Sequence, residues 1–250
     1  MRFFWITAIF VVAFVATLIA KLPLAFVLNV VGAKSDGFQY DKAYGTVWSG
    51  ALSEVKVSGE DVGLVQLKFR PASLMQVKPE YDLRFSGPIT EAQGKLRLSL
   101  AGGISLHTFL AEIKLNKVRH LDERLRRSDS SLFVSIDTLK SDTNGRCVEA
   151  QGNFESDLLT NVGEVWGWDG PRLFGEVSCQ DQKYAFQLQN QGGESSFNAN
   201  AVLSHSGEYH VMAVVETQEQ ALFRVLPALG FSTGAPGRYT YSKQQQAPNL

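Results

Sequence analysis

The sequence contains little of the material from which catalytic and metal sites are usually built. Its 250 residues include only 2 cysteines and 4 histidines. Two cysteines are too few for a four-cysteine zinc site or a dense disulfide scaffold. The motifs GxSxG, GxGxxG and HExxH and the phosphate-binding loop motif are absent from the sequence. We therefore expect a protein that is not an enzyme and that carries no metal or other cofactor.

A surplus of positive charge is also lacking. Lysine and arginine together number 24 against 25 aspartates and glutamates, which gives a formal net charge of -1. Binding to nucleic-acid phosphates needs an excess of lysine and arginine, so we expect no nucleic-acid partner. Hydrophobic residues make up 44% of the chain, which is enough to form a core and argues against global disorder.

One long apolar run lies at the N-terminus. Residues 3–20 read FFWITAIFVVAFVATLIA and include no charged side chain. A helix of this length would span about 27 Å, close to the thickness of the hydrocarbon core of a bilayer. The small-x-small pattern of a cleaved signal peptide is missing. Cleavage after Ala20, for example, would place Leu18 at position −3, where a small residue is needed. We expect an uncleaved transmembrane signal anchor, with Arg2 in the cytoplasm and the chain beyond Lys21 translocated.

Four regions follow from this assignment. We expect a cytoplasmic stub and anchor at 1–21, an apolar connecting segment at 22–44, a periplasmic β domain at 45–241 and a loose polar tail at 242–250. Pro23, early in the connecting segment, suits the first turn of a helix. That helix could lie on the membrane or cap one end of the soluble domain, and a short element packed in the core is an equally good interpretation.

Most of the remaining chain alternates between apolar and polar residues, which is typical of strands in an antiparallel sheet with one buried face. Short turn segments separate the strands and leave no room for helical crossovers, so the fold class is mostly β, an extended and twisted antiparallel sheet. Two short helices are expected, at 119–127 and at 217–226, where Thr217 and Gln220 form a capping-box pattern. Clear alternation occurs at 82–87, 95–100, 131–137, 175–180, 183–189, 196–204 and 208–216.

Two groups of residues are candidate partner contacts. The basic run from Lys114 to Arg127 could bind an acidic partner or lipid headgroups, although a solvated helix face is the commoner explanation. Exposed tryptophans would be interface anchors, although tryptophans that fold back to close the end of a sheet are equally ordinary. The candidates are Arg119, Arg124, Arg126, Arg127, Trp166 and Trp168.

Cys147 and Cys179 both fall in predicted strands. A translocated domain meets an oxidising compartment, which favours a disulfide between them over two buried free thiols. In the chain-entropy model such a bond would stabilise the domain by roughly 3–4 kcal/mol.

The segment GTVWSG places Trp48 between Gly45 and Gly50. Glycines permit close backbone approach while the indole packs on one face, which by itself indicates a sheet. In its context the segment resembles the Gly-x-x-Trp-x-Gly element of the type II secretion system protein N family. The resemblance extends along the chain, through an N-terminal anchor, Leu22–Pro23, Cys147 with Gly152, Gly175 with Cys179, Leu229–Gly230 and Gly237 with Tyr239.

This resemblance implies an accessory protein of the Gram-negative inner membrane, which is single-pass and places its β domain in the periplasm. Its expected partners are the inner-membrane platform subunits, the outer-membrane secretin and membrane lipids. Gly45, Trp48 and Gly50 carry over as a structural signature. The sheet pattern is also similar to that of AsmA-like envelope proteins, in which an apolar groove would hold lipid. An envelope hydrolase is a third possibility, for which the sequence offers no nucleophile and base.

Overall fold

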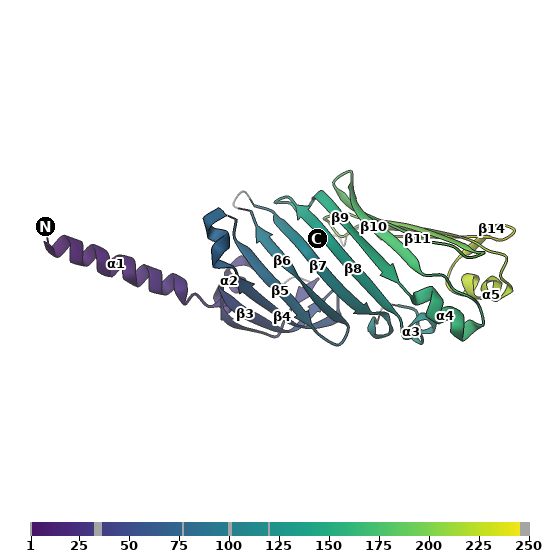
Figure 1. The fold of residues 1–250 in the computed structure, drawn as a ribbon, viewed down its shortest axis with the longest axis horizontal. Helices are drawn as coiled ribbons and strands as arrows, with labels where there is room; N and C mark the ends of the chain where they lie inside the picture. The colour runs from purple at the N-terminus through teal and green to yellow at the C-terminus, as the bar shows by residue number, and fades with distance from the viewer. Residues whose placement is uncertain (1, 33–36, 77, 100–101, 120, 246–250) are drawn as a thin grey trace.

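The computed structural model describes the chain except residues 1, 33–36, 77, 100–101, 120 and 246–250. One long antiparallel sheet makes up most of the molecule, and a single helix projects from one end of it (Figure 1). The helices are α1 (Arg2–Ala20), α2 (Leu24–Val31), η1 (Pro71–Gln76), η2 (Leu115–Lys117), α3 (Glu123–Arg126), α4 (Leu158–Trp166) and α5 (Gln220–Ala228). The strands are β1 (Phe38–Gln39), β2 (Lys42–Thr46), β3 (Ser49–Val57), β4 (Glu60–Phe69), β5 (Glu80–Ser86), β6 (Thr90–Leu98), β7 (Ile104–Lys114), β8 (Ser131–Ser141), β9 (Cys147–Ser156), β10 (Leu173–Gln180), β11 (Lys183–Asn190), β12 (Ser196–Leu203), β13 (Tyr209–Glu216), β14 (Ser232–Ala235) and β15 (Arg238–Gln245).

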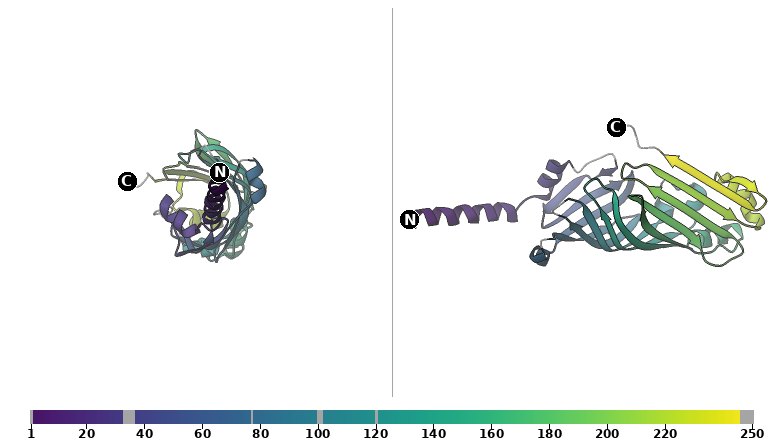
Figure 2. Two further views of the ribbon diagram at one scale, coloured as in Figure 1. Left: turned by 90° about the vertical axis from the view of Figure 1, so that its left-hand side faces the viewer. Right: turned by 90° about the horizontal axis from the view of Figure 1, so that it is seen from above.

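The sheet is a meander with small irregularities at its two ends. Its order is β1-β3-β4-β5-β6-β7-β8-β9-β10-β11-β12-β13-β15-β14, and β2 also pairs with β3. The short turns between strands allow each strand to pair with its neighbour in sequence, so the prediction of a mostly β, antiparallel fold is confirmed. Figure 2 shows that the strands wrap around the long axis of the molecule as the sheet twists.

The two faces of the sheet differ in chemistry because the sequence alternates. Phe85 lies opposite Ala92, Ala92 opposite Ala111, Ala111 opposite Val134 and Val134 opposite Phe154. Residues directly opposite each other in a ladder point to the same face, so these five residues define an apolar face. Their immediate neighbours along each strand define the opposite, polar face.

Two hydrophobic clusters occupy the two ends of the apolar face. The first joins Leu24 of α2 to Tyr40, Leu52, Val55 and Val65, and Val65 lies opposite Phe85. The second joins Leu222 and Leu226 of α5 to Trp168, Leu173, Phe197, Val215 and Tyr239. The helices thus cover apolar side chains at the ends of the sheet, and α2 caps one end of the domain as one of the sequence interpretations proposed.

The structure moves several predicted boundaries. The sheet begins at Phe38, inside the expected connecting segment, because β1 and β2 both pair with β3. Residues 242–245 were expected in the loose tail, but they extend β15 because β13 offers a complete partner strand. Residues 100, 120 and 246–250, which belong to a predicted strand, helix and tail, lie outside the described residues.

The predicted helices exist but differ in extent. The helix expected at 119–127 is reduced to α3, which Asp122 caps by accepting a hydrogen bond from the backbone N–H of Arg124. The second helix begins at Gln220, and Thr217 does not cap it as expected because its hydroxyl bonds to Ser195 and to the N–H of Glu219. Over the described residues, no helix combines the length and the hydropathy needed to cross a membrane.

Candidate functional site: the junction between α1 and the sheet

The GTVWSG segment forms the hairpin turn between β2 and β3. Gly45 lies opposite Gly50 and Thr46 lies opposite Ser49, which leaves Val47 and Trp48 at the tip of the turn. Gly45 has a φ of 78°, and a Cβ at this position would come within 2.4 Å of the carbonyl oxygen of Ser49. A residue without a side chain is therefore required where the turn begins.

Gly50 is required for a different reason. A Cβ on Gly50 would lie 2.6 Å from Cδ2 of Leu24 and 2.8 Å from the carbonyl oxygen of Tyr44. Leu24 is the first residue of α2 and belongs to the hydrophobic cluster at this end of the sheet. The glycine therefore allows α2 to rest directly on the hairpin.

Trp48 joins this hairpin to the end of α1. Its indole Nε1–H donates a hydrogen bond of 2.9 Å to the carbonyl oxygen of Ile19, which belongs to the last turn of α1, where carbonyl groups lack partners within the helix. The backbone N–H of Val47 donates to the carbonyl oxygen of Leu22 at 3.0 Å. An open apolar recess of about 420 Å³ lies between Trp48 and Ala16, Ile19 and Ala20. The hairpin therefore holds both α1 and the link that follows it.

The other side of Trp48 contacts Phe69, the last residue before the segment that leads into η1. The rings of Trp48 and Phe69 meet edge to face at 4.9 Å, and the N–H of Phe69 donates to the carbonyl oxygen of Trp48 at 2.8 Å. Phe69 ends β4, and η1 begins two residues later at Pro71. The hairpin therefore contacts α1 and α2 directly and, through Phe69, the end of the strand that leads into η1.

Glu80 fastens η1 to the sheet. Its carboxylate accepts hydrogen bonds from Arg70 at 2.9 Å and from Arg97 at 2.8 Å, and its backbone N–H donates to the hydroxyl of Ser73. Burial opposes ionisation of Glu80, but the bonds from Arg97 and Arg70 outweigh burial and hold its pKa below the ordinary value of 4.5. The sequence analysis missed this group because its members come from three separate segments.

Apolar side chains are exposed around this junction. On α2, Leu24 faces the core while Phe26 and Val30 are 59% and 71% exposed. On η1, Leu74 and Met75 are 53% and 91% exposed. Figure 2 shows α2 and η1 at the end of the sheet from which α1 departs.

A second candidate site is a groove of about 1090 Å³ that crosses the sheet from β5 to β12. Its lining combines residues of the polar face with Phe85, Ala92, Ala111, Val134 and Phe154, which define the apolar face. The polar residues include Glu91, Gln93, Glu112, Asn153, Glu155, Glu176, Gln187, Gln189, Asn198 and Asn200. Apolar side chains also line it, among them Leu110, Phe133 and Phe174, so the chemistry of the groove is mixed. In the described part of the chain, no group of three or more acidic, histidine or cysteine residues is arranged to hold a metal ion.

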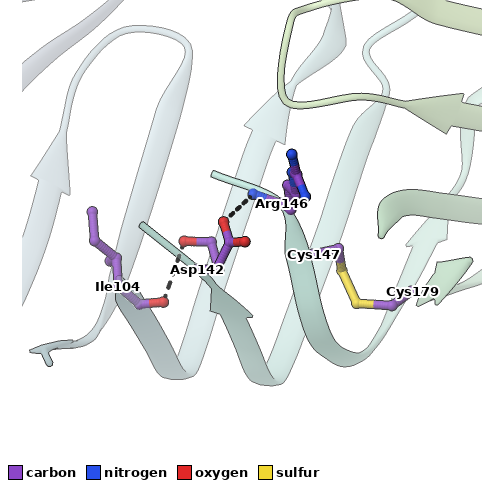
Figure 3. The surroundings of a disulfide bond; sticks show 6 residues. Ile104, Asp142, Arg146, Cys147 and Cys179 are labelled. Carbon is purple, nitrogen blue, oxygen red and sulfur yellow. Dashed lines mark hydrogen bonds between the residues drawn. A yellow bond between two sulfur atoms is a disulfide. The ribbon is translucent and has the colours of Figure 1, made fainter. Parts of the chain in front are cut away.

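The predicted disulfide between Cys147 and Cys179 is present. It joins the first residue of β9 to β10, in the part of the two strands that lies beyond Val177 and Gly152, the last paired residues of their ladder. Figure 3 shows the turn that precedes Cys147, in which the carboxylate of Asp142 accepts a hydrogen bond from the N–H of Arg146. The bond therefore closes a place where the two strands separate.

The candidate tryptophans have different surroundings. Trp168 is only 7% exposed and packs against Phe197 in the cluster under α5. Its burial fits the second interpretation given from the sequence, in which the tryptophan folds back to close the end of the sheet. Trp166, the last residue of α4, is half-buried.

The candidate arginines make contacts with different parts of the chain. Arg124 donates to the carbonyl oxygen of Ala228 at 3.0 Å, which joins α3 to α5. Arg127 pairs with Glu123, and the backbone N–H of Arg119 donates to Glu60. Arg119, Arg124 and Arg127 are exposed, whereas Arg126 is partly buried.

Comparisons with known proteins agree with the motif analysis. The family described as type II secretion system (T2SS), protein N, matches residues 36–242 of this chain. The chain is 30% identical over 80 residues to type II secretion system protein N from Aeromonas hydrophila. This alignment covers 32% of the chain and 32% of the relative, so the chain matches about a third of the length of that curated relative. No solved structure matches the chain significantly.

Proposed function

The chain belongs to the type II secretion system protein N family, and we propose that it is an accessory component of that system, anchored in the inner membrane by α1. The β domain lies in the periplasm and contacts platform subunits, the outer-membrane secretin or both during export of folded proteins. The observation that carries this proposal is the junction at Trp48, which joins an exposed apolar helix to a long sheet through the signature hairpin.

The chemistry of α1 supports a membrane position. The helix has 19 residues and would span about 28 Å. Its described large apolar side chains, among them Phe10, Val12 and Leu18, are exposed. An isolated helix with such a surface is unfavourable in water, whereas lipid chains would cover it. This placement leaves the N-terminus in the cytoplasm and the sheet outside.

The disulfide supports a periplasmic location for the sheet. Such bonds form and persist in oxidising compartments and are rare in the cytosol. Cys147 is buried, and both cysteines of the chain are used in the bond.

The dimensions of the sheet suit a component that reaches away from the membrane. Helix α1 leaves one end of the long axis, and α3, α4 and α5 lie toward the other end (Figure 1). At about 4.8 Å between neighbouring strands, the row from β1 to β14 extends on the order of 60 Å along the curved sheet. We place the partner contacts of Arg119, Arg124, Arg127 and Trp166 on the part of the domain distant from α1.

In-cell photo-crosslinking tests this function. A photoreactive amino acid replaces Arg127 or Trp166 in a functional, tagged copy, and the captured envelope proteins are identified by mass spectrometry. Recovery of platform subunits or secretin is the expected result. Capture of phospholipid-transport or lipopolysaccharide-assembly proteins without any secretion component would contradict it and favour a lipid-handling role.

A further inference from the structure

We propose that the end of the sheet nearest α1 is itself a membrane-binding surface. This docking face consists of the exposed side chains of Phe26 and Val30 on α2 and of Leu74 and Met75 on η1. They insert into the interfacial layer of the same bilayer that α1 enters. The inference rests on the proposed function, which places α1 in the membrane.

The docking face is held at a fixed position relative to the end of α1. Trp48 donates a hydrogen bond to Ile19 of α1 and packs edge to face against Phe69, which lies two residues before η1. Gly50, two residues after Trp48, allows Leu24 of α2 to contact the hairpin. Since α1 and α2 meet the hairpin and η1 follows Phe69 beside it, a bilayer that contains α1 lies next to α2 and η1 as well (Figure 2).

The way these helices pack gives the docking face its chemistry. Helix α2 buries Leu24 and directs Phe26 and Val30 away from the domain, although apolar side chains of this kind usually face a core. Met75 is almost fully exposed even though Glu80 and its arginine partners hold η1 firmly in place. Ordered helices that present apolar residues outward are typical of segments that lie in a membrane interface.

Polar features at the same end also fit lipid headgroups. Lys21, at the end of α1, and Lys78, just after η1, are both exposed, and lysines near a membrane surface are attracted to anionic lipids. Trp48, in the hairpin, contacts the end of α1. Tryptophan is enriched at the level of the lipid headgroups. The lipid bilayer therefore fits this surface better than a protein partner does, because α1 already leads into it.

Attachment at α1 and at the docking face together would set the angle between the sheet and the membrane. A single helix would allow the sheet to tilt. Contacts on two sides of that helix would instead keep the long axis of the sheet pointing away from the bilayer. Partners would then meet the distant end of the sheet at a defined height.

Two matched methionines allow a direct test in the full-length chain. Met75 lies on the docking face, and Met212 is 50% exposed on β13, away from α1. Both native cysteines are in the disulfide, so the thiol of a Met75→Cys or Met212→Cys variant can be labelled selectively with a fluorophore. Each labelled protein is reconstituted into vesicles of phosphatidylethanolamine and phosphatidylglycerol, with and without brominated lipids that quench fluorescence.

We expect lipid quenching at position 75 to exceed that at position 212 by about threefold or more, because interfacial segments bury their apolar side chains about 5–10 Å deep. Phe26→Asp in the Met75→Cys background should reduce this quenching while the protein stays in the vesicles. Equal, weak quenching at both positions would overturn the proposal, as would a label shielded from aqueous iodide but unaffected by brominated lipid, which indicates a protein contact.

Flotation of the vesicles after alkaline extraction separates this inference from the anchor. If the protein floats but shows no quenching at position 75, the result supports the membrane anchor and excludes the docking face. If alkali releases the protein but position 75 was quenched before extraction, the result supports the docking face and excludes the anchor. Protein that neither floats nor shows quenching excludes both.

Discussion

The indole of Trp48 donates a 2.9 Å hydrogen bond to the carbonyl oxygen of Ile19, a residue 29 positions earlier in the chain. This bond connects the signature hairpin of the sheet to the last turn of α1. It gives Trp48 a specific role, because phenylalanine could replace its packing against Phe69 but could not donate the bond. The signature is therefore a structural joint between a helix and a sheet.

Trp48→Phe should loosen this joint and leave the sheet intact. The lost hydrogen bond is worth about 0.5–1.5 kcal/mol, and the carbonyl of Ile19 loses its side-chain partner. Hydrogen exchange should become faster at backbone amides around Lys21 to Leu24 and stay unchanged in β8 and β9. Trp166→Phe is the matched control. Unchanged exchange at the junction would show that the bond does not hold α1.

Gly50→Ala should destabilise the domain by about 1–3 kcal/mol, because the added methyl group overlaps Leu24 and backbone carbonyl groups. Gly234→Ala is the control, since a Cβ on Gly234 meets nothing within 4 Å. The free energies of unfolding, measured with urea, provide the comparison. If both variants had the same stability as the parent protein, α2 would not rest on the hairpin as described.

Replacing Cys147 and Cys179 together with serine should lower the free energy of unfolding by roughly 3–4 kcal/mol in the chain-entropy model. Reductant should shift the urea midpoint of the parent protein in the same direction and leave the double variant unaffected. If reductant left the urea midpoint of the parent protein unchanged, the disulfide would not stabilise the fold.

Glu80→Gln should weaken the attachment of η1 in a pH-dependent manner. Because the folded-state pKa of Glu80 lies below 4.5, its ion pairs stabilise the fold fully above that pH, and their contribution disappears as pH falls through the folded-state pKa. We expect a loss of about 1–3 kcal/mol at neutral pH. The difference between variant and parent protein should shrink below about pH 4.5. A difference that stays constant down to pH 3 would contradict this role.

The local pattern of the sequence determined most of the sheet. Alternation at 131–137 and 183–189 predicted β8 and β11, because the side-chain period of two leaves one face of a strand buried. Short turns between the strands determined that neighbours in sequence pair with each other. The disulfide and the family were also predicted from the sequence, from the two cysteines and from the order of the motifs. The match to residues 36–242 confirms the family.

Only the tertiary structure decided how distant segments meet. The bond from Trp48 to Ile19, the position of Glu80 between Arg70 and Arg97, and the burial of Trp168 under α5 all join residues whose local sequence carries no sign of the partner. The groove across the sheet depends on the twist and register of eight strands, from β5 to β12. Alternation specifies which residues share a face, whereas the curvature of the whole sheet decides which face is hollowed.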